Sequence, residues 1–148
     1  MTAPAPAGVH HLAIAVRDLP ATESFYQDVL GLPVLRRWPA PEGAAIDGAS
    51  IDRSVWLDLG AGAFLALERT AAGVPGRDDQ LPGLQLLALR IAVAARAEWE
   101  GSFARAGVPI VHRTAYTIYV RDPEGNRIGL SHWPDAAPED GAGAAGDE

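Results

Sequence analysis

The sequence predicts an α+β protein made of two βαβββ modules related by an internal pseudo-twofold axis. Two observations support this prediction. The segment HLAIAV at residues 11–16 is echoed by LLALRI at residues 86–91, and each copy continues into a helical pattern followed by a Gly-x-Pro step and an apolar pair. Such a duplication predicts one ordered domain at residues 8–134, with module one at 8–70 and module two at 84–134. The modules could pair within a chain or between two chains.

Module one opens with a strand, because residues 9–16 are rich in branched side chains. Asp18 can cap the helix that follows, and Gly31 marks its end. The remaining strands are expected at residues 33–38, 54–59 and 63–68, with a long loop at 39–53 and a glycine-bearing hairpin at 60–62.

Module two repeats this order. A strand is expected at residues 84–93 and a helix at about 96–106, where Gly107 marks the end. The segment at 122–125, Asp-Pro-Glu-Gly, has the residues that a type I turn favours. The remaining strands are expected at 108–112, 116–120 and 127–131.

Composition excludes several kinds of chemistry. The 148 residues include no cysteine and no lysine, since all twelve basic residues are arginine. This rules out a thiol nucleophile, a thiolate metal ligand and a Schiff-base lysine. The chain has no basic run interleaved with aromatic residues, no membrane-spanning apolar stretch and no signal-peptide pattern. We therefore expect a cytoplasmic protein that binds neither nucleic acid nor membrane.

The net charge of −7 is concentrated near one end of the chain. Residues 135–148 contain five acidic residues and no arginine, which leaves a net charge of −2 for residues 1–134. This segment and residues 1–7 are too poor in apolar bulk to pack. We expect a disordered lead-in at 1–7 and a disordered acidic tail at 135–148. The total charge therefore says little about the charge of a ligand.

Two segments resemble a known family. HHLAIAVRDLPATESFYQDVLGLPV near the start and YTIYVRDPEGNRIGLSH near the end are similar to the vicinal oxygen chelate superfamily, which includes glyoxalase I, bleomycin-resistance proteins, fosfomycin-resistance enzymes and extradiol dioxygenases. The resemblance covers residues 8–133. It implies a cup-shaped mixed sheet with the helices outside, a homodimer and, in the enzymes, a divalent metal ion in the cup.

The metal-dependent members take their ligands from four strand positions, which correspond here to His11, Ala66, Leu86 and Gly129. Only His11 has a side chain that binds metal. A catalytic zinc site uses about three protein ligands. The resemblance therefore implies a degenerate site without a cofactor, and a bound divalent metal is the alternative.

Other candidate residues lie near these positions. Side chains two residues apart on a strand share a face, so Glu68 and Ser131 face the same side as the vacant positions. His11 and Glu68 are the candidate catalytic residues. Their structural alternatives are a leftover hydrogen-bonded histidine and a carboxylate paired with an arginine such as Arg90. The candidate ligand-binding residues are Trp38, Trp56, Leu86, Arg90, Tyr116, Gly129 and Ser131.

Two main functions follow from this reading. The first is binding or sequestering of a small organic molecule in an apolar cup, similar to bleomycin-resistance proteins, because replacing ligands by small and apolar residues enlarges and dries the cavity. The alternative is a glyoxalase- or dioxygenase-type enzyme, a lyase, isomerase or ring-cleaving oxygenase. It would depend on a metal held by His11 and Glu68, or use them as acid and base. A third possibility is a partner or regulatory module whose cup is a filled core.

Overall fold

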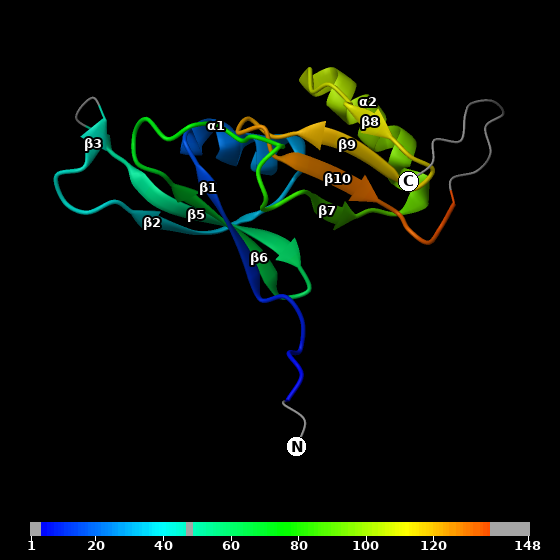
Figure 1. Ribbon diagram of the computed structural model, residues 1–148, viewed down its shortest axis with the longest axis horizontal. Coiled ribbons are helices and arrows are strands. Elements are labelled where there is room, and N and C mark those ends of the chain that lie inside the picture. Colours follow the sequence, from blue (N-terminus) through cyan, green and yellow to red (C-terminus); the bar gives the residue numbers. More distant parts are fainter. Residues whose placement is uncertain (1–3, 47–48, 137–148) are drawn as a thin grey trace. The chain divides into compact units, whose positions relative to one another are not determined.

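The computed structural model describes residues 4–46 and 49–136 (Figure 1). The chain forms two compact units, unit 1 at Met1–Gly76 and unit 2 at Arg77–Glu148. Residues 4–7 form no helix or strand. The rest of the disorder predicted at the two ends falls mostly on residues 1–3 and 137–148, which lie outside the described residues. None of the helices in the described part of the chain has the length and apolar character needed to cross a bilayer.

Unit 1 contains a four-stranded mixed sheet and one helical segment. The strand order is β1-β6-β5-β2, with β1 parallel to β6 and the other pairs antiparallel. The elements of the sheet are β1 (His11–Val16), β2 (Val34–Pro39), β5 (Asp52–Gly60) and β6 (Ala63–Arg69). The helical segment consists of α1 (Leu19–Ser24) and η1 (Phe25–Val29). Asp18 caps α1 as expected, because its carboxylate accepts a hydrogen bond from the backbone N–H of Ala21 at 3.1 Å.

Two details of unit 1 differ from the sequence-based expectation. The helix widens into a π-helical turn at η1, where the N–H of Leu30 donates to the carbonyl of Phe25. This turn buries Phe25 and Tyr26 next to each other. The segment 39–53 is not entirely a loop, because it contains the short strands β3 (Ala45–Ile46) and β4 (Ala49–Ser50) and the start of β5.

Unit 2 contains a second four-stranded mixed sheet, with the order β7-β10-β9-β8. Its strands are β7 (Leu87–Arg90), β8 (His112–Arg113), β9 (Thr117–Arg121) and β10 (Arg127–Ser131). A short 3-10 turn, η2 (Val93–Ala95), leads into the helix α2 (Arg96–Ala106). Gly107 ends α2 with a φ of 68°, a left-handed conformation that favours glycine. Both units thus follow the order βαβββ, and the predicted α+β class with two such modules is confirmed.

Two strands of unit 2 are shorter than predicted. The predicted strand at 108–112 is reduced to β8, because Pro109 has no N–H to donate to a ladder. The predicted strand at 84–93 is reduced to β7, which pairs with β10 over four residues. The residues just before β7 are consequently free of ladder pairing, and Leu86 among them contributes to the surface described below.

The β9-β10 hairpin is closed by the turn that the sequence predicts. The N–H of Gly125 donates to the carbonyl of Asp122 at 3.0 Å. The Asp122 carboxylate accepts hydrogen bonds from the backbone N–H groups of Glu124 and Asn126 at 3.0 and 2.8 Å. This turn sets the register in which Arg121 lies directly opposite Arg127.

Candidate functional site

One face of the unit 1 sheet packs on α1 and the other does not. Leu65 and Leu67 on β6 and Val55 on β5 are fully buried in the core, and Arg37 of β2 bonds to Glu23 of α1 from this same side. The alternating residues form what we call the helix-free face of unit 1. They are His11, Ala13 and Ala15 of β1, Arg36 and Trp38 of β2, Ser54, Trp56 and Asp58 of β5, and Phe64, Ala66 and Glu68 of β6.

Four aromatic side chains cross this face as a continuous row, one from each strand. His11 stacks on Phe64 with ring centroids 4.7 Å apart and an interplanar angle of 5°. Phe64 stacks on Trp56 at 4.4 Å, and Trp56 contacts Trp38 at 5.2 Å. The guanidinium of Arg36 lies 3.8 Å above the Trp38 ring and extends the row. We call His11, Phe64, Trp56 and Trp38 the aromatic row.

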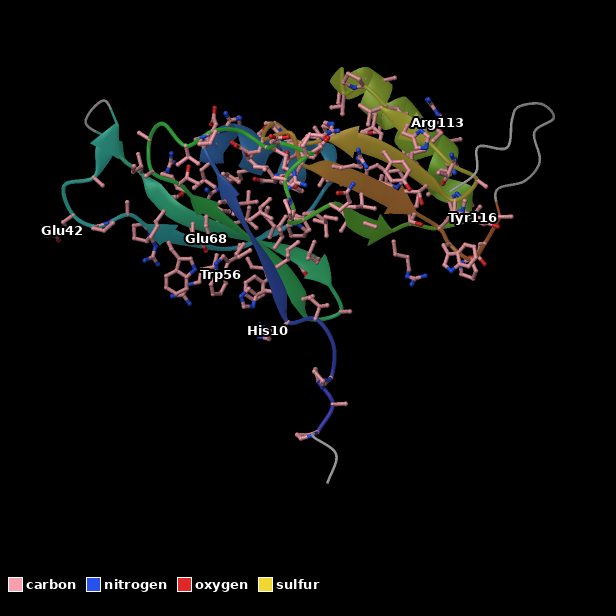
Figure 2. The ribbon with its side chains drawn as sticks, viewed as in Figure 1. His10, Glu42, Trp56, Glu68, Arg113 and Tyr116 are labelled. Atoms are coloured by element: carbon pink, nitrogen blue, oxygen red, sulfur yellow. The ribbon has the colours of Figure 1, made fainter. Side chains whose placement is uncertain are left out.

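Polar groups lie beside the aromatic row. Ser54 and Glu68 are directly opposite each other on β5 and β6, and the Ser54 hydroxyl donates to Oε1 of Glu68 at 2.7 Å. Glu68 therefore takes its hydrogen bond from a serine, where an arginine was the expected structural partner. Figure 2 shows Trp56 and Glu68 together in unit 1, with His10 at the start of β1. The indole Nε1 atoms of Trp38 and Trp56 are buried without a hydrogen-bond partner among the described residues, so each is an unmet donor that costs about 1–3 kcal/mol.

His11, the candidate that matches a metal-ligand position, is exposed and already engaged on two sides. Its Nδ1 lies 2.8 Å from Nδ1 of His10, a hydrogen bond in which one ring donates and the other accepts. Its ring face covers Phe64. The structural alternative considered for His11 was a leftover hydrogen-bonded histidine, and its contact with His10 is of that kind.

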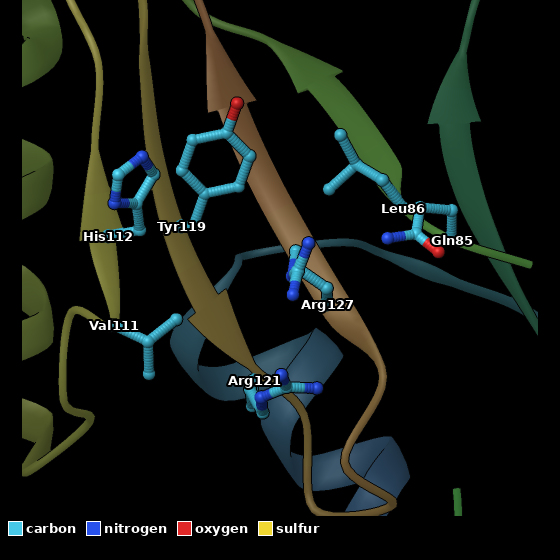
Figure 3. Close-up of a pocket in the computed structure, with 7 residues that line it drawn as sticks. All are labelled: Gln85, Leu86, Val111, His112, Tyr119, Arg121 and Arg127. Carbon is cyan, nitrogen blue, oxygen red and sulfur yellow. The ribbon is translucent and has the colours of Figure 1, made fainter. Parts of the chain in front are cut away.

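Unit 2 has a pocket on its own sheet (Figure 3), with a volume of about 480 Å³. It includes Leu86 from the predicted ligand-binding set and Val111 as apolar walls. The rest of the lining is polar or aromatic and consists of Gln85, His112, Tyr119, Arg121 and Arg127. Strands β9 and β10 each place an arginine in this pocket, so it combines apolar walls with cationic groups.

The remaining candidates of unit 2 lie outside this pocket. Tyr116 contacts Trp133 edge-on at 4.7 Å, and Ser131 accepts a hydrogen bond from the Thr117 hydroxyl at 3.0 Å. Arg90 is exposed and donates to the carbonyl of Trp133 at 3.4 Å. These contacts give the three candidates local structural partners, and the pocket does not bring them together.

The residues at the four family metal positions do not fit a metal ion. Ala66 is 2% exposed and lies opposite Trp56 in the sheet. A Cβ atom added to Gly129 would lie 3.0 Å from Cγ2 of Thr117 and 3.3 Å from Cδ1 of Leu86, so the space for a ligand side chain is already filled there. Across residues 4–46 and 49–136, no group of three or more histidine or acidic side chains is arranged to hold a metal. We derive no catalytic step through a metal.

Several residues of these surfaces were missed by sequence reasoning. Phe64 shares its face with Ala66 and Glu68 by the two-residue period of a strand, and that period could have identified it. The same period joins Arg127 to Gly129.

Comparisons with known proteins agree with this fold. The model of the Glyoxalase/Bleomycin resistance protein/Dioxygenase superfamily matches residues 8–130. No curated protein matches the sequence.

Solved structures resemble the chain over most of its length. A glyoxylase/bleomycin resistance protein/dioxygenase domain from Frankia sp. EAN1pec is 21% identical with a TM-score of 0.68, over 86% of this chain and 98% of that one. The trypanothione-dependent glyoxalase I of Leishmania major is 26% identical with a TM-score of 0.64, over 86% and 87%. A fosfomycin resistance protein from Mesorhizobium loti is 14% identical with a TM-score of 0.62, over 86% and 92%. By the match to its family model, the chain belongs to the glyoxalase/bleomycin resistance protein/dioxygenase superfamily.

Proposed function

We propose that this protein binds a flat organic molecule against the aromatic row of unit 1, without a metal ion, and acts by holding or sequestering it as bleomycin-resistance proteins do. The observation that carries the proposal is the row itself. Four strands each contribute one aromatic ring, and successive rings lie 4.4–5.2 Å apart. The exposed parts of His11, Trp56 and Trp38 offer a ligand apolar contact from side chains that their neighbours already hold in place.

The polar groups beside the row suit the orientation of a ligand. Glu68 is half-buried, and Ser54 occupies one oxygen of its carboxylate. The indole N–H groups of Trp38 and Trp56 are buried and lie out of a ligand's direct reach. A flat molecule with a hydrogen-bond donor for the second carboxylate oxygen of Glu68 therefore matches the chemistry of this face.

The enzymatic alternative through His11 and Glu68 has less support. Glu68 lies four residues beyond Phe64, which is the register partner of His11. At about 3.3 Å per residue this separates the two backbone positions by about 13 Å along the sheet. Each side chain is also held by a neighbour, His11 by His10 and Glu68 by Ser54. The separation argues against their sharing one metal ion or one proton.

The proposal is tested by titrating the protein with proflavine, a flat tricyclic aromatic compound, and with copper-free bleomycin, while tryptophan fluorescence is recorded. Protein treated with EDTA and desalted should bind as well as untreated protein. Trp56→Leu should weaken binding by about tenfold, since an aromatic contact contributes about 0.5–1.5 kcal/mol beyond its area. Trp133→Leu, which removes an exposed tryptophan of unit 2, should leave the affinity unchanged.

Three results would count against the proposal. The first is the absence of saturable quenching with both probes. The second is an equal loss of affinity in Trp56→Leu and Trp133→Leu. Affinity lost with EDTA and restored by zinc would instead favour the metal-dependent enzyme. The homodimer and the cytoplasmic location that the sequence implies remain predictions, and light scattering on the purified protein tests the first of them.

A further inference from the structure

Two arginines of unit 2 point to a second candidate binding site. Arg121 on β9 and Arg127 on β10 are directly opposite each other across the hairpin, and both line the 480 Å³ pocket. Like charges placed opposite each other on neighbouring strands destabilise a sheet. The arrangement therefore needs a negative charge close by.

Asp79 is the carboxylate that these arginines share. It accepts from both terminal nitrogens of Arg121, at 2.6 and 3.3 Å, and it lies 3.6 Å from Arg77. The hydrogen bond from Arg121 lowers the pKa of Asp79, and the same bond, with a smaller effect of the Asp122 charge, raises the pKa of Arg121. Asp79 therefore lies within 4.0 Å of three arginines, Arg77, Arg121 and Arg127, and Arg121 is the nearest of them.

Arg127 is the member of the cluster that is left with binding capacity. Its nearest terminal nitrogen is 4.0 Å from Asp79, beyond hydrogen-bonding distance. Among the described residues its side chain makes no hydrogen bond, whereas the Arg121 side chain also donates to the carbonyl of Gly125 at 2.7 Å. Its side chain is 34% exposed at the pocket, so a ligand can reach it.

Other donors line the same pocket. The Tyr119 hydroxyl, the His112 imidazole and the Gln85 amide have no hydrogen-bond partner within residues 4–46 and 49–136. The rings of His112 and Tyr119 lie 5.5 Å apart, and Figure 3 shows Tyr119 and Arg127 on neighbouring strands. Leu86 and Val111 add an apolar wall. A guanidinium with a hydroxyl, an amide and an apolar wall is the chemistry that holds an oxyanion attached to an organic group.

We propose that this pocket binds a small organic anion, whose phosphonate, phosphate or carboxylate group is held by Arg127 and whose apolar part contacts Leu86 and Val111. The site lies within unit 2 and shares no residue with the aromatic row. It would stand if the proposed function of unit 1 failed, and the two are tested with different probes and different variants.

The test uses isothermal titration of the full chain with phenylphosphonate, a dianion, and benzoate, a monoanion. Benzyl alcohol serves as the neutral analogue, and the buffer contains no other oxyanion. We expect phenylphosphonate to bind more tightly than benzoate, and benzyl alcohol not to bind. Arg127→Gln should weaken phenylphosphonate by at least about tenfold, because a hydrogen bond to a charged group is lost.

Two further variants test whether binding depends on the pocket residues themselves. Arg113→Gln on β8 removes the same charge from an arginine that is bound to Glu100 and does not line the pocket, and it should leave the affinity unchanged. Tyr119→Phe keeps the ring and the charge, and it should weaken binding by about threefold. Equal losses in Arg127→Gln and Arg113→Gln, equal binding of phenylphosphonate and benzyl alcohol, or no saturable binding of either anion would overturn the proposal.

Discussion

The substitution Gly129→Ala tests whether the family metal position in unit 2 has been filled by packing. An alanine Cβ at this position would lie 3.0 Å from Cγ2 of Thr117, 3.3 Å from Cδ1 of Leu86 and 3.7 Å from Cβ of Ala88. Carbon atoms pack best at about 3.5–4.0 Å, so two of the three contacts are too short. Overpacking of this kind costs about 1–3 kcal/mol, while replacing a glycine inside a strand returns about 0.5–1 kcal/mol. We expect Gly129→Ala to lower the free energy of unfolding by about 1 kcal/mol.

A double-mutant cycle identifies the cause of this loss. Thr117→Ser removes Cγ2 but keeps the hydroxyl that donates to Ser131 at 3.0 Å. In the Thr117→Ser background, Gly129→Ala should leave the free energy of unfolding almost unchanged. The coupling energy between the two substitutions, measured by urea denaturation, should therefore be about 1 kcal/mol. The matched control is Gly101→Ala in α2, where the nearest atom is the flexible end of Arg105 at 3.2 Å. The control should stabilise by up to about 1 kcal/mol. An equal loss from Gly129→Ala in both backgrounds would refute the reasoning.

Three further predictions concern polar contacts. Ser54→Ala should lower the free energy of unfolding, measured by urea denaturation, by about 1.5–3 kcal/mol. The reason is that Ser54 is 1% exposed and its hydroxyl donates to the Glu68 carboxylate. A loss below the error of the measurement would contradict this. Arg37→Gln should lower the free energy of unfolding by about 1–3 kcal/mol, because its main partner Glu23 is only 12% exposed and would lose its arginine. The part of the loss that comes from the more exposed pair with Asp52 should shrink with added salt. An unfolding free energy equal to that of the unsubstituted protein would contradict this. Asp79→Asn should lower stability at neutral pH. The pKa of Asp79 is below its ordinary value through the bond with Arg121, so the contribution is present above the ordinary pKa and is lost as the pH falls through the lowered one. Denaturation of both proteins across the acid range checks this, and a difference that persisted at the lowest pH would contradict it.

The sequence predicts the order of the elements well because each signal is local. The boundaries of α2 and β10 match the structure, since Gly107 ends the helix and the turn at 122–125 positions the last strand. The predicted strand at 108–112 was wrong because Pro109, which lies inside it, has no N–H for a ladder, and this local signal could have been used. The predicted strand at 84–93 was too long for a different reason, since the length of β7 depends on its pairing with four residues of β10.

Some of the candidate site residues could be predicted from the sequence and others could not. Trp38 and Trp56 were nominated as ligand-binding residues, and the structure places them next to each other. Their neighbour Phe64 was missed although the two-residue period places it on the same face as Ala66, because its role comes from stacking between His11 and Trp56 on the two adjacent strands. Arg127 was missed for a similar reason, since its importance comes from standing opposite Arg121, a relation that exists only once the hairpin has formed.

The positions that correspond to metal ligands in the family are occupied differently in the two units. This affects which substitutions could introduce a metal ligand. In unit 2 the space at Gly129 is filled by Thr117 and Leu86, so a glutamate there would first have to displace a packed pair. In unit 1 Ala66 is covered within the aromatic row, opposite Trp56. Restoring a ligand at either position would disrupt the contacts from which the proposed binding is inferred. On the unit 1 sheet, a metal ligand at position 66 and a molecule bound at the aromatic row would therefore compete for the same space beside Trp56.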